Sequence, residues 1–310
     1  MGVYVETEIR CSLDELWRRT QDPREHARWD LRFSEIEYLP RPDGEQLQQF
    51  VYRTRIGVLA IAGQGRTVGS RETAAGECVS ALKFWSDDPR SLIREGAGHW
   101  KYFPGDGAVR FATRYDYRVR YGFAGRLLDR LVFRRWMAWA TAWSFDRLRL
   151  WIEKGIDPAS SLRLSAVHWL ARVGVAFVWL YQGIVPKLFR PHADELVMLR
   201  DAGFSSETAG CLLHILGWAE IAIALAVLIA RRPARLFAFT LVLMAAATAA
   251  VAIFSPSYLT AAFNPVSLNV AVAVLAGIGW LSSHDLPSAA HCRYSRSSKH
   301  AEESRPEVEQ

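Results

Sequence analysis

Residues 236–254 read LFAFTLVLMAAATAAVAIF and contain no charged side chain. A helix needs about 20 mostly apolar residues to cross the hydrocarbon core of a bilayer. Neighbouring stretches at residues 164–185, 211–230 and 266–282 have the same character. Buried helices of soluble proteins imitate one such segment, but four in succession with short connectors are typical of a membrane protein. The sequence therefore predicts an all-α bundle of four transmembrane helices over residues 164–282.

The segments on either side of this apolar region differ from it in composition. Residues 1–155 are dense in arginine, acidic and aromatic residues, which predicts a soluble domain, and residues 156–163 form a short linker. Residues 283–310 are polar and low in complexity, which predicts a disordered tail. No charged stretch followed by an apolar segment opens the chain, so we expect no secretory signal peptide and a first domain that stays in the cytoplasm.

Basic residues beside the spans predict the orientation, because cytoplasmic loops carry an excess of Lys and Arg. The link between the second and third spans contains Arg231, Arg232 and Arg235, whereas the link at 255–265 has no charge. Both termini are therefore expected on the cytoplasmic side of a bacterial-type membrane. The net charge of +6 follows the same distribution and favours attraction to the lipid bilayer over binding of nucleic acid.

Polar side chains inside the predicted spans are costly in lipid and are expected to face protein or water. His168, Arg172 and Gln182 share one stripe of the first span, and the second span carries His214 and Glu220. At 1.5 Å per residue, Arg172 and Glu220 lie about 12 Å and about 15 Å from the inner ends of their spans. We therefore predict an Arg172–Glu220 ion pair. It either fixes the helix register or forms a functional polar site with the other three residues.

A set of short motifs runs through residues 165–282. They are Trp179-x-x-Gln182-Gly183-x-x-Pro186-Lys187, Glu195, Gly217-x-x-Glu220, Phe263-Asn264-Pro265 and Asn269. This pattern resembles the DoxX-like family of four-helix membrane proteins. The resemblance implies that some members associate with membrane redox complexes. The four cysteines are scattered and no haem-type histidine pair is evident, so no cofactor is expected within the chain. A redox role would need a membrane redox partner or a bound quinone.

Alternation and turn signals in residues 1–155 predict a strand, two short helices, six further strands and a long helix. Ser12 is the expected N-cap of the first helix, with Glu15 at capping-box spacing. The further strands are expected at residues 33–39, 46–56, 58–73, 77–85, 92–103 and 108–120. From 123 to 153, Leu and Trp residues recur at helical spacing between arginines. We favour a core helix there, since the strands need a covering helix; the alternative is an amphipathic helix on a membrane surface.

Three motifs accompany this order of elements: Ser12-Leu-Asp-Glu-Leu-Trp17, Asp22-Pro23-x-x-His26-x-x-Trp29, and the closing helix from Gly125-Arg-Leu-Leu128 to Trp151-Ile-Glu153. Together they resemble the helix-grip fold of the SRPBCC superfamily, which includes polyketide cyclase and START-like domains. The resemblance implies an α+β domain, with a curved antiparallel sheet over a long C-terminal helix and an apolar ligand between them. We expect Trp136, Trp139 and Trp143 to line that pocket.

No catalytic residue is carried over from the superfamily, and no HxxxH, HExxH or facial-triad spacing predicts a metal site. The sequence is compatible with three alternative functions. In the first, the cytoplasmic domain binds a hydrophobic or lipid-like small molecule next to the bilayer, as the short linker favours. In the second, the chain is an accessory membrane subunit of a quinone-linked oxidoreductase. In the third, it is a cyclase-like or hydrolase-like enzyme. A binding role is the preferred expectation.

Overall fold

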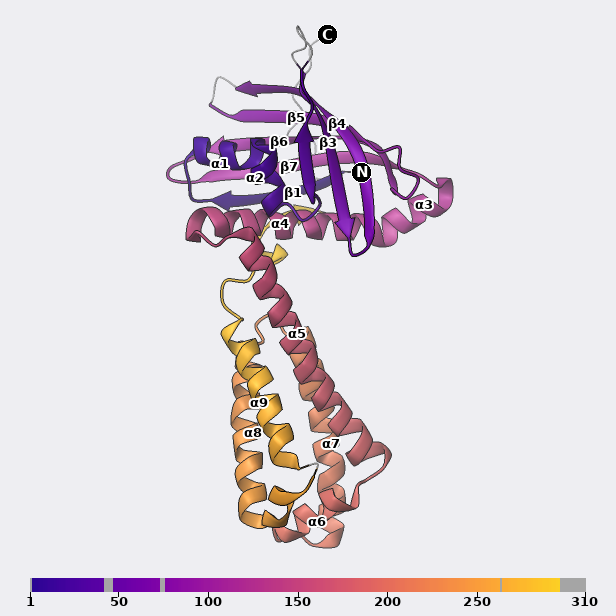
Figure 1. Cartoon of the computed structure of the whole chain (residues 1–310), viewed down its shortest axis with the longest axis vertical. Coiled ribbons are helices and arrows are strands. Elements are labelled where there is room, and N and C mark those ends of the chain that lie inside the picture. The colour runs from indigo at the N-terminus through magenta and orange to yellow at the C-terminus, as the bar shows by residue number, and fades with distance from the viewer. Residues whose placement is uncertain (1, 42–46, 73–75, 263, 296–310) are drawn as a thin grey trace. The chain divides into compact units, whose positions relative to one another are not determined.

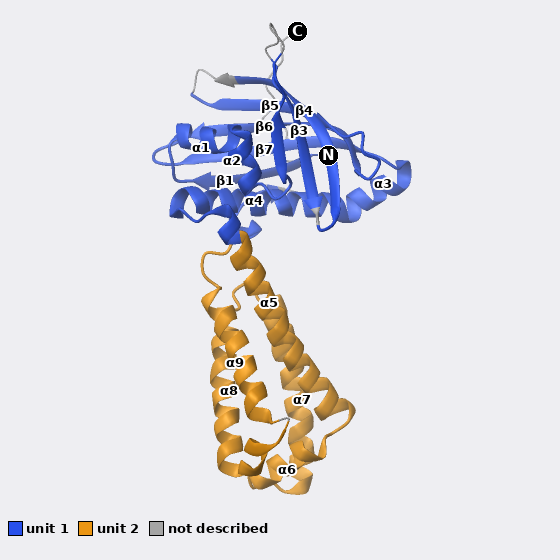
Figure 2. Ribbon diagram, viewed as in Figure 1, with its two compact units in different colours: residues 1–161, 287–310 blue, residues 162–286 orange. Residues whose placement is uncertain are grey.

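The computed structural model describes residues 2–41, 47–72, 76–262 and 264–295. The chain divides into two compact units (Figure 2). Unit 1 comprises residues 1–161 and 287–310, and unit 2 comprises residues 162–286. Phe263 of the DoxX-like motif and residues 296–310 of the predicted tail lie outside the described residues.

An antiparallel sheet forms one layer of unit 1 (Figure 1). Its eight described strands follow the order β2-β3-β4-β5-β6-β7-β1-β8, so β2 to β7 form a meander and β1 pairs with the last strand of that meander. Val3, Val5, Thr7 and Ile9 are buried on one face of β1, which is the period-two pattern of a half-buried strand. The bounds are β1 Val3–Ile9, β2 Glu35–Tyr38, β3 Gln49–Ile56, β4 Leu59–Glu72, β5 Cys78–Trp85, β6 Ile93–Pro104, β7 Val109–Val119 and β8 Arg293–Ser295.

The helices of unit 1 begin where the sequence predicts. The Ser12 side chain accepts a hydrogen bond from the backbone N–H of Glu15 at 3.2 Å and caps α1. Asp22 caps α2 in the same way, and Pro23 occupies the first turn. The bounds are α1 Leu13–Gln21, α2 Pro23–Trp29, α3 Gly122–Leu128, a π-helical turn η1 Asp129–Phe133, and α4 Arg134–Lys154.

Helix α4 is the long helix that covers the sheet. Phe145 of α4 stacks on Phe111 of β7 with 4.5 Å between ring centroids, and Leu148 is fully buried in the same core as Val5. A helix buried against one face of an antiparallel sheet is the arrangement that the helix-grip resemblance implies. The fold class predicted for residues 1–155 is therefore confirmed.

All regular secondary structure in the described residues of unit 2 is helical. Its elements are α5 Pro158–Gly183, a π-helical segment η2 Ile184–Phe189, α6 Ala193–Asp201, α7 Ser206–Ile229, α8 Ala234–Phe254, a 3₁₀ turn η3 Pro256–Thr260, and α9 Pro265–Leu281. Helix α5 begins in the last residues of unit 1. Helix α6 falls in the connector at 187–210, where no helix was expected. Large side chains such as Leu170 and Val242 are exposed on these helices, as lipid-facing side chains would be.

The described helices support three membrane spans, at Pro158–Phe189, Ser206–Ile229 and Ala234–Phe254. The fourth predicted span coincides with α9, an apolar helix of 17 residues. At 1.5 Å per residue it is about 26 Å long, slightly less than the ~30 Å hydrocarbon core. The positions of the four apolar helices were thus predictable, but a count of four spans is not confirmed.

The described part of residues 283–310 departs from the disordered tail that its composition predicts. A 3₁₀ turn, η4 Ala289–His291, and strand β8 belong to unit 1, and β8 pairs with β1. The Cys292 thiol is buried and donates to the carbonyl of Ala142 at 3.2 Å. Asp146 Oδ2 accepts hydrogen bonds at 2.8 Å from the backbone N–H of Ser288 and from the His291 ring. These contacts hold a short segment that has no periodicity long enough to be recognised in the sequence.

We expect Asp146→Ala to release residues 288–295 from unit 1. Asp146 is fully buried and also accepts from Arg149 Nε at 2.7 Å, and removing one member of a buried charged network costs about 3 kcal/mol. Hydrogen–deuterium exchange of the full-length chain should therefore become roughly hundredfold faster at the amides of 289–294. The control, Asp14→Ala on the exposed side of α1, should leave this exchange unchanged. Equal exchange in both variants would contradict the role of Asp146.

Candidate functional site

Unit 1 contains a cavity of about 420 Å³. Strands β2 to β7 and helices α1, α2 and α4 contribute to its lining. Small-molecule sites in proteins usually measure about 300–1,000 Å³ and have mainly apolar walls. The apolar part of this lining includes Ile36, Phe50, Ile61, Leu82, Phe84, Phe133 and Met137.

Two glycines of β4 shape the walls of this cavity. Phe50 lies opposite Gly65 and Tyr52 opposite Gly63 in the β3–β4 ladder. A Cβ atom at Gly65 would lie 2.2 Å from the Phe50 ring, and one at Gly63 would lie 2.3 Å from the Tyr52 ring. Any larger residue would therefore displace these rings. Both aromatic side chains line the cavity, so the Gly-x-Gly spacing in β4 lets them lie across the strand.

Arg32 and His26, two polar residues of the lining, belong to a charged network with Asp30. The fully buried Asp30 carboxylate accepts from Arg32 Nε at 2.9 Å and from Arg32 Nη2 at 2.6 Å, and His26 Nε2 lies 3.1 Å from its Oδ2. Burial raises the pKa of Asp30, but the charge of Arg32 and the hydrogen bonds from His26 and Arg32 outweigh burial and hold that pKa well below its usual range. Burial lowers the pKa of His26. The network therefore contains a neutral imidazole and an ion pair with no net charge at neutral pH.

Tyr115 adds a hydroxyl group to the same lining. Its Oη atom shares a hydrogen bond with Thr141 Oγ1 of α4 at 2.9 Å, and burial raises the pKa of Tyr115. The His26 ring is held by stacking on Trp29 and by an edge contact with Trp100, each with 4.9 Å between ring centroids. The cavity thus places a few fixed polar groups beside a large apolar surface, which suits an amphipathic molecule.

Only one of the three tryptophans predicted to line the pocket does so. Trp136 lines the cavity together with Met137 and Ala140. Trp139 and Trp143 instead stack on each other, with 6.2 Å between centroids; Trp143 is buried in the core and Trp139 is 41% exposed. Residues three, four and seven positions apart lie on the same side of a helix, so helical spacing alone did not distinguish the tryptophan that reaches the cavity from the two that do not.

Arg172 and Glu220 each have a different partner from the one predicted. Arg172 donates from Nη2 to the carbonyl of Leu228 at 2.9 Å and also to the carbonyls of Val227 and Ala230. These carbonyls lie at the end of α7, where a helix leaves its last C=O groups without internal partners and its dipole favours a cation. The predicted Arg172–Glu220 pair rested on the similar depths of the two residues in the membrane. Depth alone was not sufficient, because the long side chain of Arg172 reaches the C-terminal end of α7.

Glu220 forms its ion pair with Lys187. Lys187 Nζ lies 3.2 Å from Glu220 Oε1 and 3.1 Å from Glu195 Oε1, and the lysine side chain is only 7% exposed. A Cβ atom at Gly183 would lie 2.6 Å from the carbonyl oxygen of Gly217. Two glycines therefore allow α5 and α7 to touch next to this cluster. Both glycines, Lys187 and Glu195 belong to the DoxX-like motif, but their association was not predicted.

The remaining predicted polar residues of the spans do not join this cluster. His168 Nδ1 lies 3.3 Å from Ser282 Oγ, and its ring meets Phe237 edge-on. His214 Nδ1 lies 2.8 Å from the carbonyl oxygen of Gly210 in its own helix. Gln182 is half-buried in α5. His168 and His214 therefore make contacts of their own away from the Lys187 cluster.

Comparison with known proteins agrees with this architecture. Residues 176–277 match the DoxX-like family. The chain is 45% identical over 183 residues to YndG, an uncharacterised membrane protein of Bacillus subtilis (strain 168), and the match covers 58% of this chain and 68% of YndG. The chain belongs to the YndG family. The DoxX-like match includes Lys187, Glu195 and Glu220, and the resemblance stated from the sequence is confirmed.

Unit 1 has solved structures that are similar in fold. The Zhui aromatase/cyclase of Streptomyces sp. R1128 is 16% identical, with a TM-score of 0.35 over 44% of this chain and 87% of that chain. A STAR-related lipid transfer protein of Xanthomonas axonopodis is 13% identical, with a TM-score of 0.38 over 49% and 86%. A START superfamily protein of Mycobacterium smegmatis is 14% identical, with a TM-score of 0.35 over 50% and 99%.

The buried imidazole predicts how the stability of unit 1 depends on pH. Because the pKa of His26 is lower in the folded chain than the ~6.5 of an unfolded histidine, the unfolded state takes up the proton first as the pH falls. Stability is therefore fully present above about pH 6.5 and is lost below it, by about 1.4 kcal/mol for each unit of pKa lowering.

Hydrogen exchange of the core amides of β6 and β7, corrected for the intrinsic rate, should show this loss between pH 7 and pH 5. We expect His26→Gln to reduce the loss, because glutamine preserves a donor to Asp30 without titrating. The exposed residue His284 supplies the control, His284→Gln, which should retain the wild-type profile. An unchanged profile in His26→Gln would show that other groups cause the loss.

The cluster in unit 2 predicts a pattern of energetic coupling. We expect Lys187→Met to destabilise unit 2 by about 3 kcal/mol, since it leaves two carboxylates without their cation. Adding Glu220→Gln should recover at least ~1 kcal/mol, because the two residues are in contact. Arg172→Met and Glu220→Gln should instead be additive within about 0.5 kcal/mol. Reversible unfolding of the full-length chain in mixed micelles measures these terms, and strong coupling of Arg172 to Glu220 would contradict the observed partners.

Proposed function

We propose that unit 1 binds a hydrophobic or lipid-like small molecule in its cavity, on the cytoplasmic side of the membrane that unit 2 spans. The observation that carries this proposal is the cavity itself, whose walls are largely apolar and whose polar groups include those of His26, Arg32 and Tyr115. Its arrangement of a large apolar surface and few polar groups is typical of small-molecule sites. The basic link at Arg231, Arg232 and Arg235 supports the cytoplasmic location.

The covalent connection between the units favours a ligand that partitions into the bilayer. Gly155 ends α4 in the left-handed conformation, with φ of 68°. Only residues 155–157 separate α4 from α5, and three residues extend at most about 11 Å. The end of α4 is therefore held close to the start of the first span, whatever the orientation of unit 1, so a bilayer-soluble molecule has a short path to this unit.

The charges in the cavity indicate whether the polar group of the ligand is charged or neutral. Arg32 is neutralised by Asp30, to which it makes two side-chain hydrogen bonds, and His26 is neutral. A carboxylate or ammonium group placed beside Arg32, His26 and Tyr115 would find no free counter-charge there, which is costly; Arg55, which also contributes to the lining, is exposed. A hydroxyl or carbonyl group can exchange hydrogen bonds with Tyr115 and His26 without that cost. The proposed ligand is therefore an apolar molecule with an uncharged polar end.

Photo-crosslinking locates the ligand on the full-length chain. The probe is a long-chain fatty alcohol that carries a diazirine, added to the protein in detergent micelles. Crosslinked peptides are expected from β5, β7 and α4, in addition to the labelling of the apolar helices of unit 2. Ala140→Phe places a ring at the cavity wall and should reduce labelling of unit 1 roughly tenfold, which corresponds to about 1.4 kcal/mol.

A matched control separates filling of the cavity from a general increase in apolar surface. Val68 is exposed on β4, so Val68→Phe adds a ring outside the cavity and should leave the labelling of unit 1 unchanged. Labelling confined to unit 2 in the wild-type chain would contradict the proposal and place the binding site in the helices, where a quinone-linked role would have to reside.

A further inference from the structure

The helical run from α3 through η1 into α4 exposes large apolar side chains along much of its length. Phe123 is 74% exposed, and six further residues are exposed on the next turns: Leu127, Leu128, Leu131, Val132, Trp136 and Trp139. Several recur at intervals of four residues, which places them in neighbouring rows on one helical surface. Soluble proteins rarely leave an apolar surface of this extent uncovered unless it binds a membrane or a partner.

Arginines accompany this apolar surface. Arg126, Arg130 and Arg135 are exposed and form no ion pair within the part of the chain that the structure describes. Asp129, the only acid between residues 122 and 139, is buried; it accepts from the Tyr117 hydroxyl at 2.6 Å and is paired with Arg134. The run therefore presents uncompensated positive charge together with its apolar side chains.

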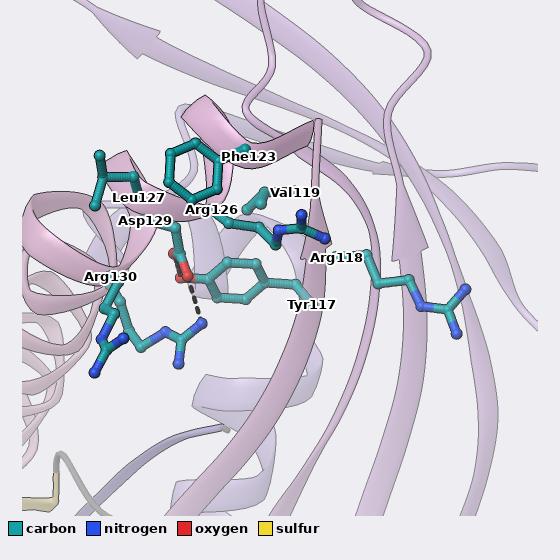
Figure 3. Close-up of a pocket in the computed structure, with 9 residues that line it drawn as sticks. Tyr117, Arg118, Val119, Phe123, Arg126, Leu127, Asp129 and Arg130 are labelled. Carbon is teal, nitrogen blue, oxygen red and sulfur yellow. Dashed lines mark hydrogen bonds and ion pairs between the residues drawn. The ribbon is translucent and has the colours of Figure 1, made fainter. Parts of the chain in front are cut away.

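A groove of about 800 Å³ lies between this run and the end of β7. Figure 3 shows Phe123 and Leu127 on the helical side of the groove and Tyr117 on the strand, with the Asp129 carboxylate facing the tyrosine hydroxyl. Arg126 and Arg130 line the same groove. Guanidinium groups and apolar side chains thus meet at one place, as they would to bind an anionic head group and the acyl chains attached to it.

We propose that residues 122–139 dock unit 1 onto the surface of an anionic phospholipid bilayer. Helical segments with Arg on one side and Trp, Phe and Leu on the other bind at the boundary between head groups and acyl chains. Anionic lipid attracts each basic residue near its surface, and Trp favours the same interface. The covalent link to α5 keeps unit 1 at a high effective concentration beside the membrane, so individually weak contacts are sufficient. A second copy of this surface would bring the unpaired arginines of two chains together, which disfavours self-association.

Docking would also bring one wall of the cavity to the lipid. Phe133, Trp136 and Met137 line the cavity and lie within residues 122–139. A ligand that leaves the bilayer would then reach the cavity past side chains already in contact with lipid. This consequence rests on the proposed function, whereas the docking of residues 122–139 does not.

The test uses the full-length chain reconstituted in nanodiscs, with Val132→Cys carrying an environment-sensitive fluorophore and Cys211→Ser removing the exposed native thiol. Doxyl-labelled lipid quenches a fluorophore that contacts the acyl region. We expect quenching in discs with about 30% anionic lipid and much less in purely zwitterionic discs. The same fluorophore at Val68→Cys, an exposed position on β4, should not be quenched.

Charge reversal provides the second arm of the experiment. The triple variant R126E/R130E/R135E should weaken docking at least roughly hundredfold, since loss of the attraction of each arginine alone is worth about fivefold, and it should abolish the dependence on anionic lipid. The control R24E/R66E/R94E changes the net charge equally at exposed arginines on α2, β4 and β6 and should leave docking intact. Quenching that is absent, or that does not depend on anionic lipid or on these arginines, would overturn the proposal. A fluorescence shift that rises with protein concentration, without lipid quenching, would also overturn it and indicate an interface between copies.

Discussion

The burial of α4 against the sheet is the interaction on which the rest of unit 1 depends. From Ala138 to Trp151 the helix is buried at nearly every position, including its polar residues Ser144 and Asp146. Each fully buried Phe or Leu contributes about 1.5–3 kcal/mol relative to exposure, so Phe145 and Leu148 alone weigh heavily against a typical stability of ~5–15 kcal/mol. The same helix supplies part of the cavity wall, holds the C-terminal segment through Asp146, and leads through residues 155–157 into α5.

Of the two interpretations of residues 123–153 that the sequence left open, the core helix is confirmed for the part from Ala138 onward, and the exposed first part is where membrane docking is proposed. Tryptophan and leucine recur at helical spacing throughout, and arginines interleave with them, so periodicity alone does not separate a core helix from a surface-active one. The structure buries the second part, from Ala138 onward, and exposes most of the first. A π-helical turn at Asp129–Phe133 lies within the exposed part, and such turns change which side chains share a face. The sequence pattern therefore could not predict which part of this long helical run is buried and which is exposed.

Elements with a long periodic signal were predictable, whereas individual partners were not. Alternation in Val3–Ile9, the cap at Ser12 and the apolar runs of unit 2 are local features, and the structure places an element at each. The pairing of Lys187 with Glu220 depends on the close approach of Gly183 to Gly217, which no local pattern encodes. Strand β8 spans only Arg293–Ser295, too short to give an alternation signal. The spacing of His26 in the Asp22-Pro23 motif and Asp30 just after it did contain a usable signal, because residues four apart at a helix end can meet.

The free-energy cost of an empty cavity limits what can occupy the cavity of unit 1. An empty apolar cavity costs about 24 cal/mol per Å³ in comparable core variants, which for about 420 Å³ amounts to roughly 10 kcal/mol. A cost of that size would consume most of the stability of a typical domain, so the volume must be filled by water, by a ligand or by exchange between them. Water needs polar partners in the lining. His26, Arg32 and Tyr115 supply them, as do hydroxyl groups such as those of Thr54, Ser80 and Thr113, but apolar side chains lie between them. The walls built by Phe50, Tyr52 and their glycine neighbours offer none, apart from the Tyr52 hydroxyl. The mostly apolar molecule proposed above would cover these walls, where water finds no partner, and its binding would stabilise unit 1 by an amount that grows with the logarithm of the ligand concentration relative to Kd.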